Sequence, residues 1–415
     1  MIGTSFCCRS CASTVGSLVL DLGHQPLANN LLQAADLSAD EPRFPLRVAV
    51  CERCWLVQIT DLIPPVRLFS DYLYLSSFSE TMLRHARVAA QRYIQEFSLR
   101  KNSFVVEVAS NDGYLLKNFV EAGIPCLGIE PAANIADIAR RKGVETEQAF
   151  FGRELARKIA TARGRANLIL GNNVFAHAPD INDFVRGLKE LLAPGGRIVL
   201  EFPYAADLFA KREFDTIYHE HVFYFFLTPL LVLFPRHGLD MLHVERIPIH
   251  GGSLRLFAGH AAESIPAESV LELSQKESRA GVTSWAFYDD FASRVANLQR
   301  ELSDLLSRLN ATGSSIAAYG ASAKGSTLLN SMRPPPQGID FIADRSTEKQ
   351  GRFSPGLHLP ILPPESLLER QPAHTLLLTW NFADEIFAQQ AEYIRRGGRF
   401  VLPIPDVSIF PPEVA

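Results

Sequence analysis

Between residues 80 and 201 the sequence alternates amphipathic stretches with short apolar runs, and this alternation constrains the fold more than any other feature. Apolar residues recur at helical spacing in residues 80–97, 115–122, 135–142 and 181–192. The apolar runs, each of a length typical of a buried strand, are residues 104–108, 125–130, 166–171 and 196–201. Strands that alternate with helices are typical of a doubly wound parallel sheet, so we expect an α/β fold.

A second alternating region follows a long amphipathic stretch. Residues 280–309 are expected to form a helix long enough to bridge two domains. The strands expected after it are residues 315–320, 339–343, 374–378 and 398–402. We interpret this later region as a smaller Rossmann-like domain, which shares its topology with the first region without an obvious sequence repeat.

Four of the six cysteines form two Cys-x-x-Cys pairs near the N-terminus, and each pair offers two thiolates from one tight turn. The pairs are Cys8 with Cys11 and Cys51 with Cys54. Together they complete a tetrahedral zinc site, which is structural because four thiolates leave no open position for a substrate. Residues 18–23 and 46–50 are expected to be strands between the pairs. The alternatives are a redox dithiol or unrelated buried cysteines, and Cys7 could replace Cys8 as a ligand.

Charge and hydropathy exclude several classes of partner. The net charge is −4, from 41 basic and 45 acidic residues, and no basic block is present. Binding to nucleic acid or to an anionic membrane therefore has no electrostatic support. The N-terminus lacks a charged segment followed by an apolar one, and no apolar run approaches the length of a membrane span, so we expect a cytoplasmic protein.

Polar side chains follow the expected strands at their carboxyl ends, where open α/β sheets bind ligands. The first loop, residues 107–113, contains Gly113 but not the Gly-x-Gly-x-x-Gly series of a dinucleotide site. The second strand ends at Glu130. A carboxylate at this position can accept hydrogen bonds from the two hydroxyls of a ribose. Residues 172–177 follow the third strand, and residues 192–196 are expected to make a turn. Together these loops indicate an S-adenosylmethionine site. The alternatives are a solvated acidic loop and, for His177, a helix cap.

The segment Tyr218-His219-Glu220-His221 concentrates titratable groups in a chain with 11 histidines. A zinc-binding helix spaces its histidines at i and i+4, whereas these lie at i and i+2, which share a face only in extended chain. Proton transfer near neutral pH is therefore the favoured interpretation. The alternative is a polar strand edge whose histidines cap backbone groups, and His219 has the least defined role.

Over nearly its whole length the sequence resembles the sugar-nucleotide C-methyltransferases of deoxysugar biosynthesis, which methylate C-3 of 4-keto sugars with S-adenosylmethionine. Besides the four cysteines, the segments that carry this resemblance are Asp71 to Ser79, Ser110 to Gly113, Asn172 to His177, Tyr218 to His221, His250 to Arg255, Tyr319 to Gly325, Asp344-Arg345 and Lys349 to Arg352. The resemblance implies a zinc-binding module over residues 1–70, a methyltransferase domain over 71–285 and a C-terminal Rossmann-like domain that holds the sugar nucleotide over 286–415.

The resemblance also implies roles for individual residues. His221 would be the base that removes the C-3 proton, and Tyr218, Glu220, His177 and Tyr72 would surround the hexose. The residues expected to bind the cofactor are Phe78, Glu107, Ser110, Asn111, Asp112, Gly113, Glu130, Pro131, Asn172, Asn173 and His177. The expected substrate is a sugar linked to the nucleoside diphosphate dTDP. The residues expected to bind it are His250, Ser253, Arg255, Lys324, Arg345, Lys349 and Arg352. A monomer is expected.

The chemistry explains why these residue types are needed. A carbon next to a ketone is weakly acidic, so a base must remove its proton, and donors such as Tyr218, Tyr72 or His177 would stabilise the enolate oxygen. Lys324 follows a strand in a glycine-flanked turn, where an ammonium group and backbone amides suit a diphosphate. Instead of binding substrate, the arginines could lie on a solvated surface. The segment of His250 could form a turn between strands. Two other activities stay open: methylation of a non-sugar keto acceptor and an NAD-dependent dehydrogenase or epimerase.

Overall fold

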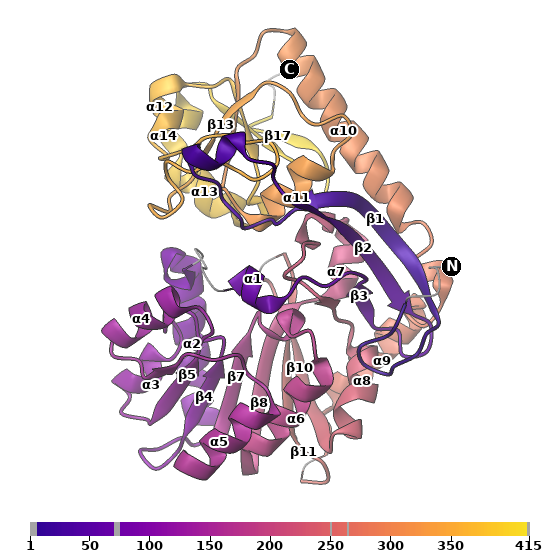
Figure 1. The fold of residues 1–415 in the computed structure, drawn as a ribbon, viewed down its shortest axis with the longest axis vertical. Helices are drawn as coiled ribbons and strands as arrows, with labels where there is room; N and C mark the ends of the chain where they lie inside the picture. Colours follow the sequence, from indigo (N-terminus) through magenta and orange to yellow (C-terminus); the bar gives the residue numbers. More distant parts are fainter. Residues whose placement is uncertain (1–5, 70–74, 250, 264, 413–415) are drawn as a thin grey trace.

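The computed structural model describes residues 6–69, 75–249, 251–263 and 265–412. Over these residues the strands form three sheets of four, seven and six strands. The seven-stranded sheet lies in the lower part of Figure 1 and the six-stranded sheet in the upper part, and strands β1 and β2 run along one side of both. None of the described helices is long and apolar enough to cross a membrane.

The four-stranded sheet is antiparallel and has the order β1-β2-β3-β9. Its strands are β1 (Gly16–Pro26), β2 (Arg43–Cys51), β3 (Val57–Ile59) and β9 (Phe223–Tyr224). The short 3-10 helix η1 (Ala34–Ser38) lies between β1 and β2, and α1 (Pro65–Phe69) follows β3. Strand β9 comes from a distant part of the chain and begins two residues after His221. The N-terminal sheet therefore touches the segment that carries the titratable cluster.

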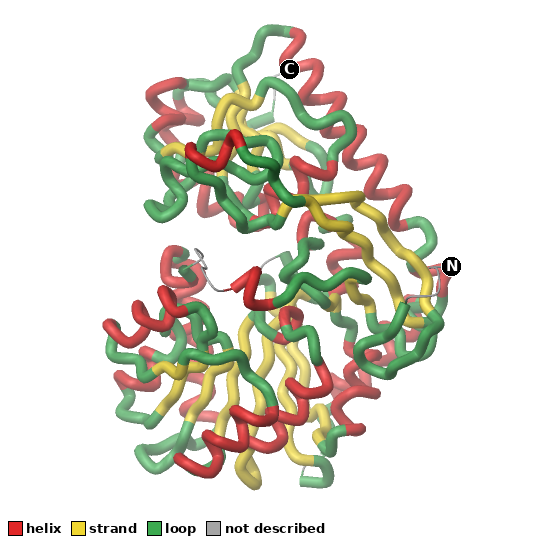
Figure 2. The backbone as a smooth tube through the Cα atoms, in the orientation of Figure 1, coloured by secondary structure: helices red, strands yellow, loops and turns green. Residues whose placement is uncertain are grey.

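The seven-stranded sheet has the order β10-β11-β8-β7-β4-β5-β6, and β11 is antiparallel to both of its neighbours. Its strands are β4 (Val105–Val108), β5 (Cys126–Ile129), β6 (Thr146–Glu147), β7 (Ala166–Asn172), β8 (Leu192–Pro203), β10 (Leu239–Ile247) and β11 (Ser253–His260). Figure 2 shows helices on both faces of this sheet. The α/β prediction is confirmed. Residues 192–196, expected to be a turn, lie instead within β8, where a register shift against β7 accommodates them.

The helices around this sheet match most of the amphipathic stretches. They are α2 (Glu80–Glu96), α3 (Lys117–Glu121), α4 (Ala133–Arg141), α5 (Arg153–Arg163), α6 (Ile181–Leu191), α7 (Ala205–Lys211) and α8 (Leu227–Arg236), with 3-10 helices η2 (Ser76–Phe78), η3 (Phe175–His177) and η4 (Phe214–Thr216). The stretch at 115–122 forms a helix only from Lys117 to Glu121. The serine hydroxyl of Ser79 accepts from the Met82 amide and caps α2.

The prediction of one helix over residues 280–309 is wrong for its first third. Helix α9 (Glu268–Ala280) ends there, because Gly281 takes the left-handed conformation (φ +81°) that closes a helix. A short 3-10 helix, η5 (Trp285–Phe287), follows, and α10 (Phe291–Ala311) begins only after it. Helix α10 packs against β1 and continues into the C-terminal region.

The C-terminal sheet has the order β14-β13-β12-β15-β16-β17, and every pair is parallel except β16 with β17. Its strands are β12 (Ile316–Tyr319), β13 (Ile339–Ala343), β14 (Ile361–Leu362), β15 (His374–Leu377), β16 (Arg399–Leu402) and β17 (Ser408–Phe410). Around it lie α11 (Ala323–Ser331), α12 (Ser366–Arg370), η6 (Trp380–Phe382), α13 (Ala383–Gln389) and α14 (Ala391–Arg395). The strand order changes direction at β12, where a doubly wound sheet binds its ligand.

Candidate active site

The four paired cysteines form one cluster in the N-terminal region. Their Sγ atoms all lie within 4.8 Å of one another, at 3.5 Å between Cys8 and Cys54 and 3.6 Å between Cys11 and Cys51. A tetrahedral zinc ion with thiolate bonds of about 2.3 Å needs sulfur atoms roughly 3.8 Å apart, so the donor set fits zinc. Cys7 is exposed and lies outside the cluster, which leaves Cys8 as the ligand.

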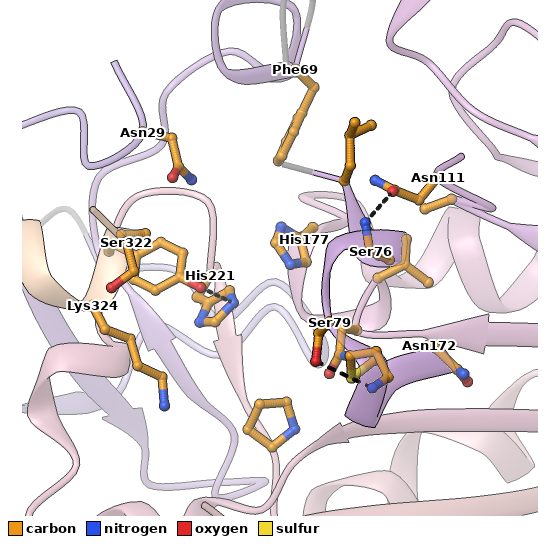
Figure 3. A pocket seen from close by; sticks show the side chains of 18 of the residues that line it. Asn29, Phe69, Ser76, Ser79, Asn111, Asn172, His177, His221, Ser322 and Lys324 are labelled. Atoms are coloured by element: carbon orange, nitrogen blue, oxygen red, sulfur yellow. Dashed lines mark hydrogen bonds between the residues drawn. The ribbon is translucent and has the colours of Figure 1, made fainter. Parts of the chain in front are cut away.

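A cavity of about 670 Å³ lies between the carboxyl ends of the seven-stranded sheet and the C-terminal domain. Residues from three separate regions of the chain line it, including Asn29 and Phe69, the loops after β4, β5 and β7, and the start of α11. In Figure 3, His221 is drawn between Lys324 on one side and His177 on the other, with Asn111 and Asn172 beyond His177. The cavity has the volume of a ligand-binding site, and His221 lies in its wall between residues of the methyltransferase sheet and of the C-terminal domain.

The loop after β4 and the end of β5 build one end of the cavity. The Glu130 carboxylate accepts from the backbone amides of Asn111 (3.0 Å) and Ala132 (3.0 Å) and lines the cavity. The Asn111 side-chain oxygen accepts from the Ser76 amide (2.9 Å), which ties η2 to this loop. At Gly113 (φ +77°) a Cβ would come within 2.8 Å of Val144, so the loop requires glycine there. The acidic, amide-rich end fits the ribose and amino-acid parts of S-adenosylmethionine.

Of the residues expected to bind the cofactor, seven line this cavity: Phe78, Asn111, Glu130, Pro131, Asn172, Asn173 and His177. The other four, Glu107, Ser110, Asp112 and Gly113, are buried and do not line it. Asp112 forms an ion pair with Lys142 (2.6 Å). Burial and the neighbouring Asp112 and Glu130 carboxylates raise the pKa of Glu107 well above its usual value. These four residues lie beneath the cavity surface, within the loop after β4 and the strand that leads into it.

His221 lies in a turn, in which its amide donates to the Tyr218 carbonyl (2.9 Å). Its Nδ1 is 2.8 Å from the Thr216 carbonyl, an acceptor, so Nδ1 carries the proton and Nε2 is the basic nitrogen. The Tyr218 hydroxyl donates to this Nε2 at 2.7 Å. Tyr218, Thr216 and His221 all line the cavity. The geometry gives His221 the protonation pattern of a general base.

His177 lies edge-on to His221, with ring centroids 4.9 Å apart. Burial lowers the pKa of His177 to about 4, so this imidazole is neutral at pH 7. Its Nδ1 has no hydrogen-bond partner among the described residues. A half-buried, neutral imidazole whose Nδ1 is unpaired among the described residues can hydrogen-bond a ligand that enters the cavity.

The other two members of the cluster point elsewhere, because the segment is a turn and not the extended chain or strand edge considered from spacing. His219 packs edge-on to Phe44, and its Nε2 lies 3.2 Å from the Pro45 carbonyl, so His219 joins the turn to β2. Burial raises the pKa of Glu220 to about 7. Its Oε1 accepts from the amide nitrogen of Asn29 (3.1 Å), which itself lines the cavity.

Three of the residues expected to bind substrate reach the cavity. Lys324, Arg345 and Lys349 line it from the C-terminal domain. Ser253, Arg255 and Arg352 do not: the Arg255 guanidinium is buried against Glu201 (2.7 Å) and Glu245 (3.2 Å), Ser253 donates to the Ile249 carbonyl, and Arg352 donates to the Glu348 carbonyl. These three contacts are internal to the protein, and the role of these residues in substrate binding stays a prediction. Tyr72 and His250 lie outside the described residues.

The structure adds two residues that sequence reasoning missed. Thr216 orients His221 through its backbone carbonyl, which every residue type possesses, so no sequence signal marks it. Asn29 lies in the loop after β1, 191 positions from its partner Glu220. Only the fold brings this pair together.

Comparison with known families covers most of the chain. Residues 8–69 match a family described as "putative zinc binding domain", residues 82–244 a "methyltransferase domain" and residues 248–405 a "C-methyltransferase C-terminal domain". The four-cysteine cluster lies within the first of these matches. The predictions of a structural zinc site and of S-adenosylmethionine as cofactor are thus confirmed.

The chain is similar to C-methyltransferase NovU of Streptomyces niveus, at 39% identity over 98% of this chain and 97% of that protein. It also resembles a solved methyltransferase from Anabaena variabilis (16% identity, TM-score 0.35, 42% of this chain and 84% of that one) and magnesium protoporphyrin IX methyltransferase from Synechocystis (12% identity, TM-score 0.34, 43% and 79%). A methyltransferase, not a dehydrogenase, is therefore the activity. This chain belongs to the zinc-containing, S-adenosylmethionine-dependent C-methyltransferases.

Proposed function

We propose that the protein methylates C-3 of a nucleoside-diphosphate-linked 4-keto deoxysugar, with His221 as the base. The observation that carries this proposal is the orientation of His221: Thr216 holds the proton on Nδ1, and Nε2 accepts from the hydroxyl of Tyr218, a residue that lines the cavity together with His221. Such a nitrogen suits removal of a proton from carbon next to a ketone. A base of this kind is superfluous for methylating an amine, which already carries a lone pair.

The residues around His221 suit the charge that develops when the proton leaves. As the C-3 proton passes to Nε2, negative charge moves to the C-4 oxygen, where hydrogen-bond donors lower the barrier. The Tyr218 hydroxyl donates to Nε2 in this structure; when Nε2 takes the C-3 proton, the hydroxyl turns its own proton to the C-4 oxygen, and His177, neutral at pH 7, adds a second polar group within the same part of the cavity. S-adenosylmethionine supplies an electrophilic methyl group when bound. Tyr72 and Glu220 complete the proposed set around the hexose.

The C-terminal side of the cavity is basic, which favours a diphosphate-bearing substrate over a small keto acid. Lys324 is the second residue of α11, whose N-terminus is capped by the Ser322 hydroxyl (3.1 Å to the Gly325 amide). Arg345 and Lys349 line the same side. A helix N-terminus together with three cations is suited to phosphate oxygens. We propose dTDP as the nucleotide and a monomeric, cytoplasmic enzyme with domains at 1–70, 71–285 and 286–415.

The test is mass spectrometry of incubations in heavy water with S-adenosylmethionine and a panel of nucleoside-diphosphate 4-keto sugars. A gain of one CH2 unit would show methylation, and deuterium at C-3 without the cofactor would show proton removal by the enzyme. Methylation of free keto acids, with no turnover of any sugar nucleotide, would overturn the proposed substrate in favour of a non-sugar acceptor. The catalytically impaired variant His221→Ala is the matched control for both signals.

A further inference from the structure

The segment that presents the base, residues 213–221, is held by residues of the C-terminal domain. The Trp380 indole Nε1 donates to Oδ2 of Asp215 at 2.7 Å. The Thr327 hydroxyl donates to the Ile217 carbonyl at 3.0 Å. These two bonds flank Thr216, whose carbonyl holds Nδ1 of His221. The C-terminal domain therefore bonds the side chain of Asp215 and the backbone of Ile217, the residues on either side of Thr216.

Both contacts are well shielded from water. Asp215 is completely buried, Thr327 is 3% exposed and Trp380 is 8% exposed. Burial raises the pKa of Asp215, while the Lys324 cation and the Trp380 indole act in the opposite direction. Loss of the indole donor would leave one buried oxygen of Asp215 without its side-chain hydrogen bond. This costs free energy, and a shift of the backbone that carries Asp215 would reduce the cost.

The Trp380 ring is itself held in place. The Lys324 ammonium lies 4.6 Å from the ring centroid, and at Gly251 a Cβ would come within 3.1 Å of the ring atom Cη2. The neighbours of Trp380 in the sequence, Thr379 and Asn381, line the cavity. The ring therefore connects the substrate side of the cavity to the segment that bears the base.

We infer that Trp380 and Thr327 are positioning residues, through which the C-terminal domain sets the proton location and orientation of His221. This inference rests on the proposed role of His221 as the base. Neither residue lines the cavity, so neither is expected to touch the substrate. Their effect is transmitted through Asp215 and Ile217 to the Thr216 carbonyl.

The test compares Trp380→Phe and Thr327→Val with Trp285→Phe, a change at a partly exposed tryptophan outside the cavity. Trp380→Phe keeps an aromatic ring for Lys324 and removes the indole donor, and Thr327→Val removes the hydroxyl with little change in shape. We expect kcat to fall roughly tenfold to a hundredfold in the first two variants, because small displacements of a catalytic group have effects of this size. The dissociation constant for S-adenosylmethionine should stay within twofold, and Trp285→Phe should match wild type.

A second readout does not depend on the substrate. Nitrogen-15 spectra of histidine-labelled protein report which ring nitrogen carries the proton, and comparison with His221→Ala assigns the signal. We expect wild type to show the Nδ1-protonated form of His221 and both variants to lose this preference. Wild-type kcat and unchanged His221 signals in both variants would overturn the inference. If no sugar nucleotide is turned over, the proposed function fails while the nitrogen signals still decide the positioning role.

Discussion

The Tyr218 hydroxyl lies 2.7 Å from Nε2 of His221, on the opposite side of the imidazole from the Thr216 carbonyl that holds Nδ1. This pairing is why we propose His221, and not His219, as the base of the cluster. His219, two positions earlier, is directed to the Pro45 carbonyl of the N-terminal sheet. A single turn thus directs one histidine to the cavity and the other to the N-terminal sheet.

Replacing His221 by alanine should abolish most turnover without affecting the cofactor. We expect kcat to fall by roughly a hundredfold to ten-thousandfold, the range for loss of a general base. Calorimetry should show an unchanged dissociation constant for S-adenosylmethionine, since the loops after β4 and β5 are untouched. Near wild-type turnover in this variant would show that another group removes the proton.

Acid should destabilise the protein through His177. Its pKa is about 4 in the folded protein against 6.5 for the ordinary side chain, so the unfolded state binds the extra proton as pH falls from 6.5 towards 4. The stability that neutral His177 contributes is complete above pH 6.5 and should fall by about 2 kcal/mol between pH 7.5 and pH 5. Urea unfolding of wild type and His177→Gln at both values measures this, with His24→Gln, an exposed histidine, as control. Equal pH dependence in wild type and His177→Gln would contradict the prediction.

Loss of zinc should destabilise the N-terminal sheet and also lower the activity. We expect one zinc per chain by elemental analysis, and Cys51→Ser should lower the free energy of unfolding by roughly 3 kcal/mol or more, because metal binding contributes directly to folding. Activity should fall too, since β9 of this sheet begins two residues after His221. Cys126→Ser, outside the cluster, should retain zinc and activity; zinc retained by Cys51→Ser would count against the four-thiolate site.

The basic side of the cavity predicts a difference between two nearby arginines. Arg345→Ala should weaken binding of dTDP roughly tenfold, because Arg345 lines the cavity and its guanidinium pairs there with Glu385 at a loose 3.7 Å. Arg352→Ala should bind as wild type does, since Arg352 does not line the cavity. Calorimetric titration with dTDP distinguishes the two, and equal losses would indicate a general charge effect.

Local sequence patterns predicted the features that depend on residues close together in the sequence. The apolar runs at 104–108 and 166–171 became β4 and β7, and the two Cys-x-x-Cys turns met as expected from their chemistry. Arg255 lies outside the cavity, paired with Glu201, because nothing in its own segment reveals this partner 54 positions away. Helix α10 began later than expected because the left-handed conformation at Gly281 ended the preceding helix.

The sequence by itself determined the α/β class, the zinc ligands and the chemical character of the Tyr218 to His221 cluster, since each follows from residue types at short spacing. Tertiary structure alone decided that Thr216 orients His221, that Asn29 contacts Glu220 and that Trp380 holds Asp215. The physical reason is that the Asn29–Glu220 and Trp380–Asp215 bonds join segments that meet only once the sheets have packed together, while the bond from His221 to Thr216 depends on how a single turn is folded. A carbonyl acceptor or a buried indole donor leaves no pattern of its own in the chain.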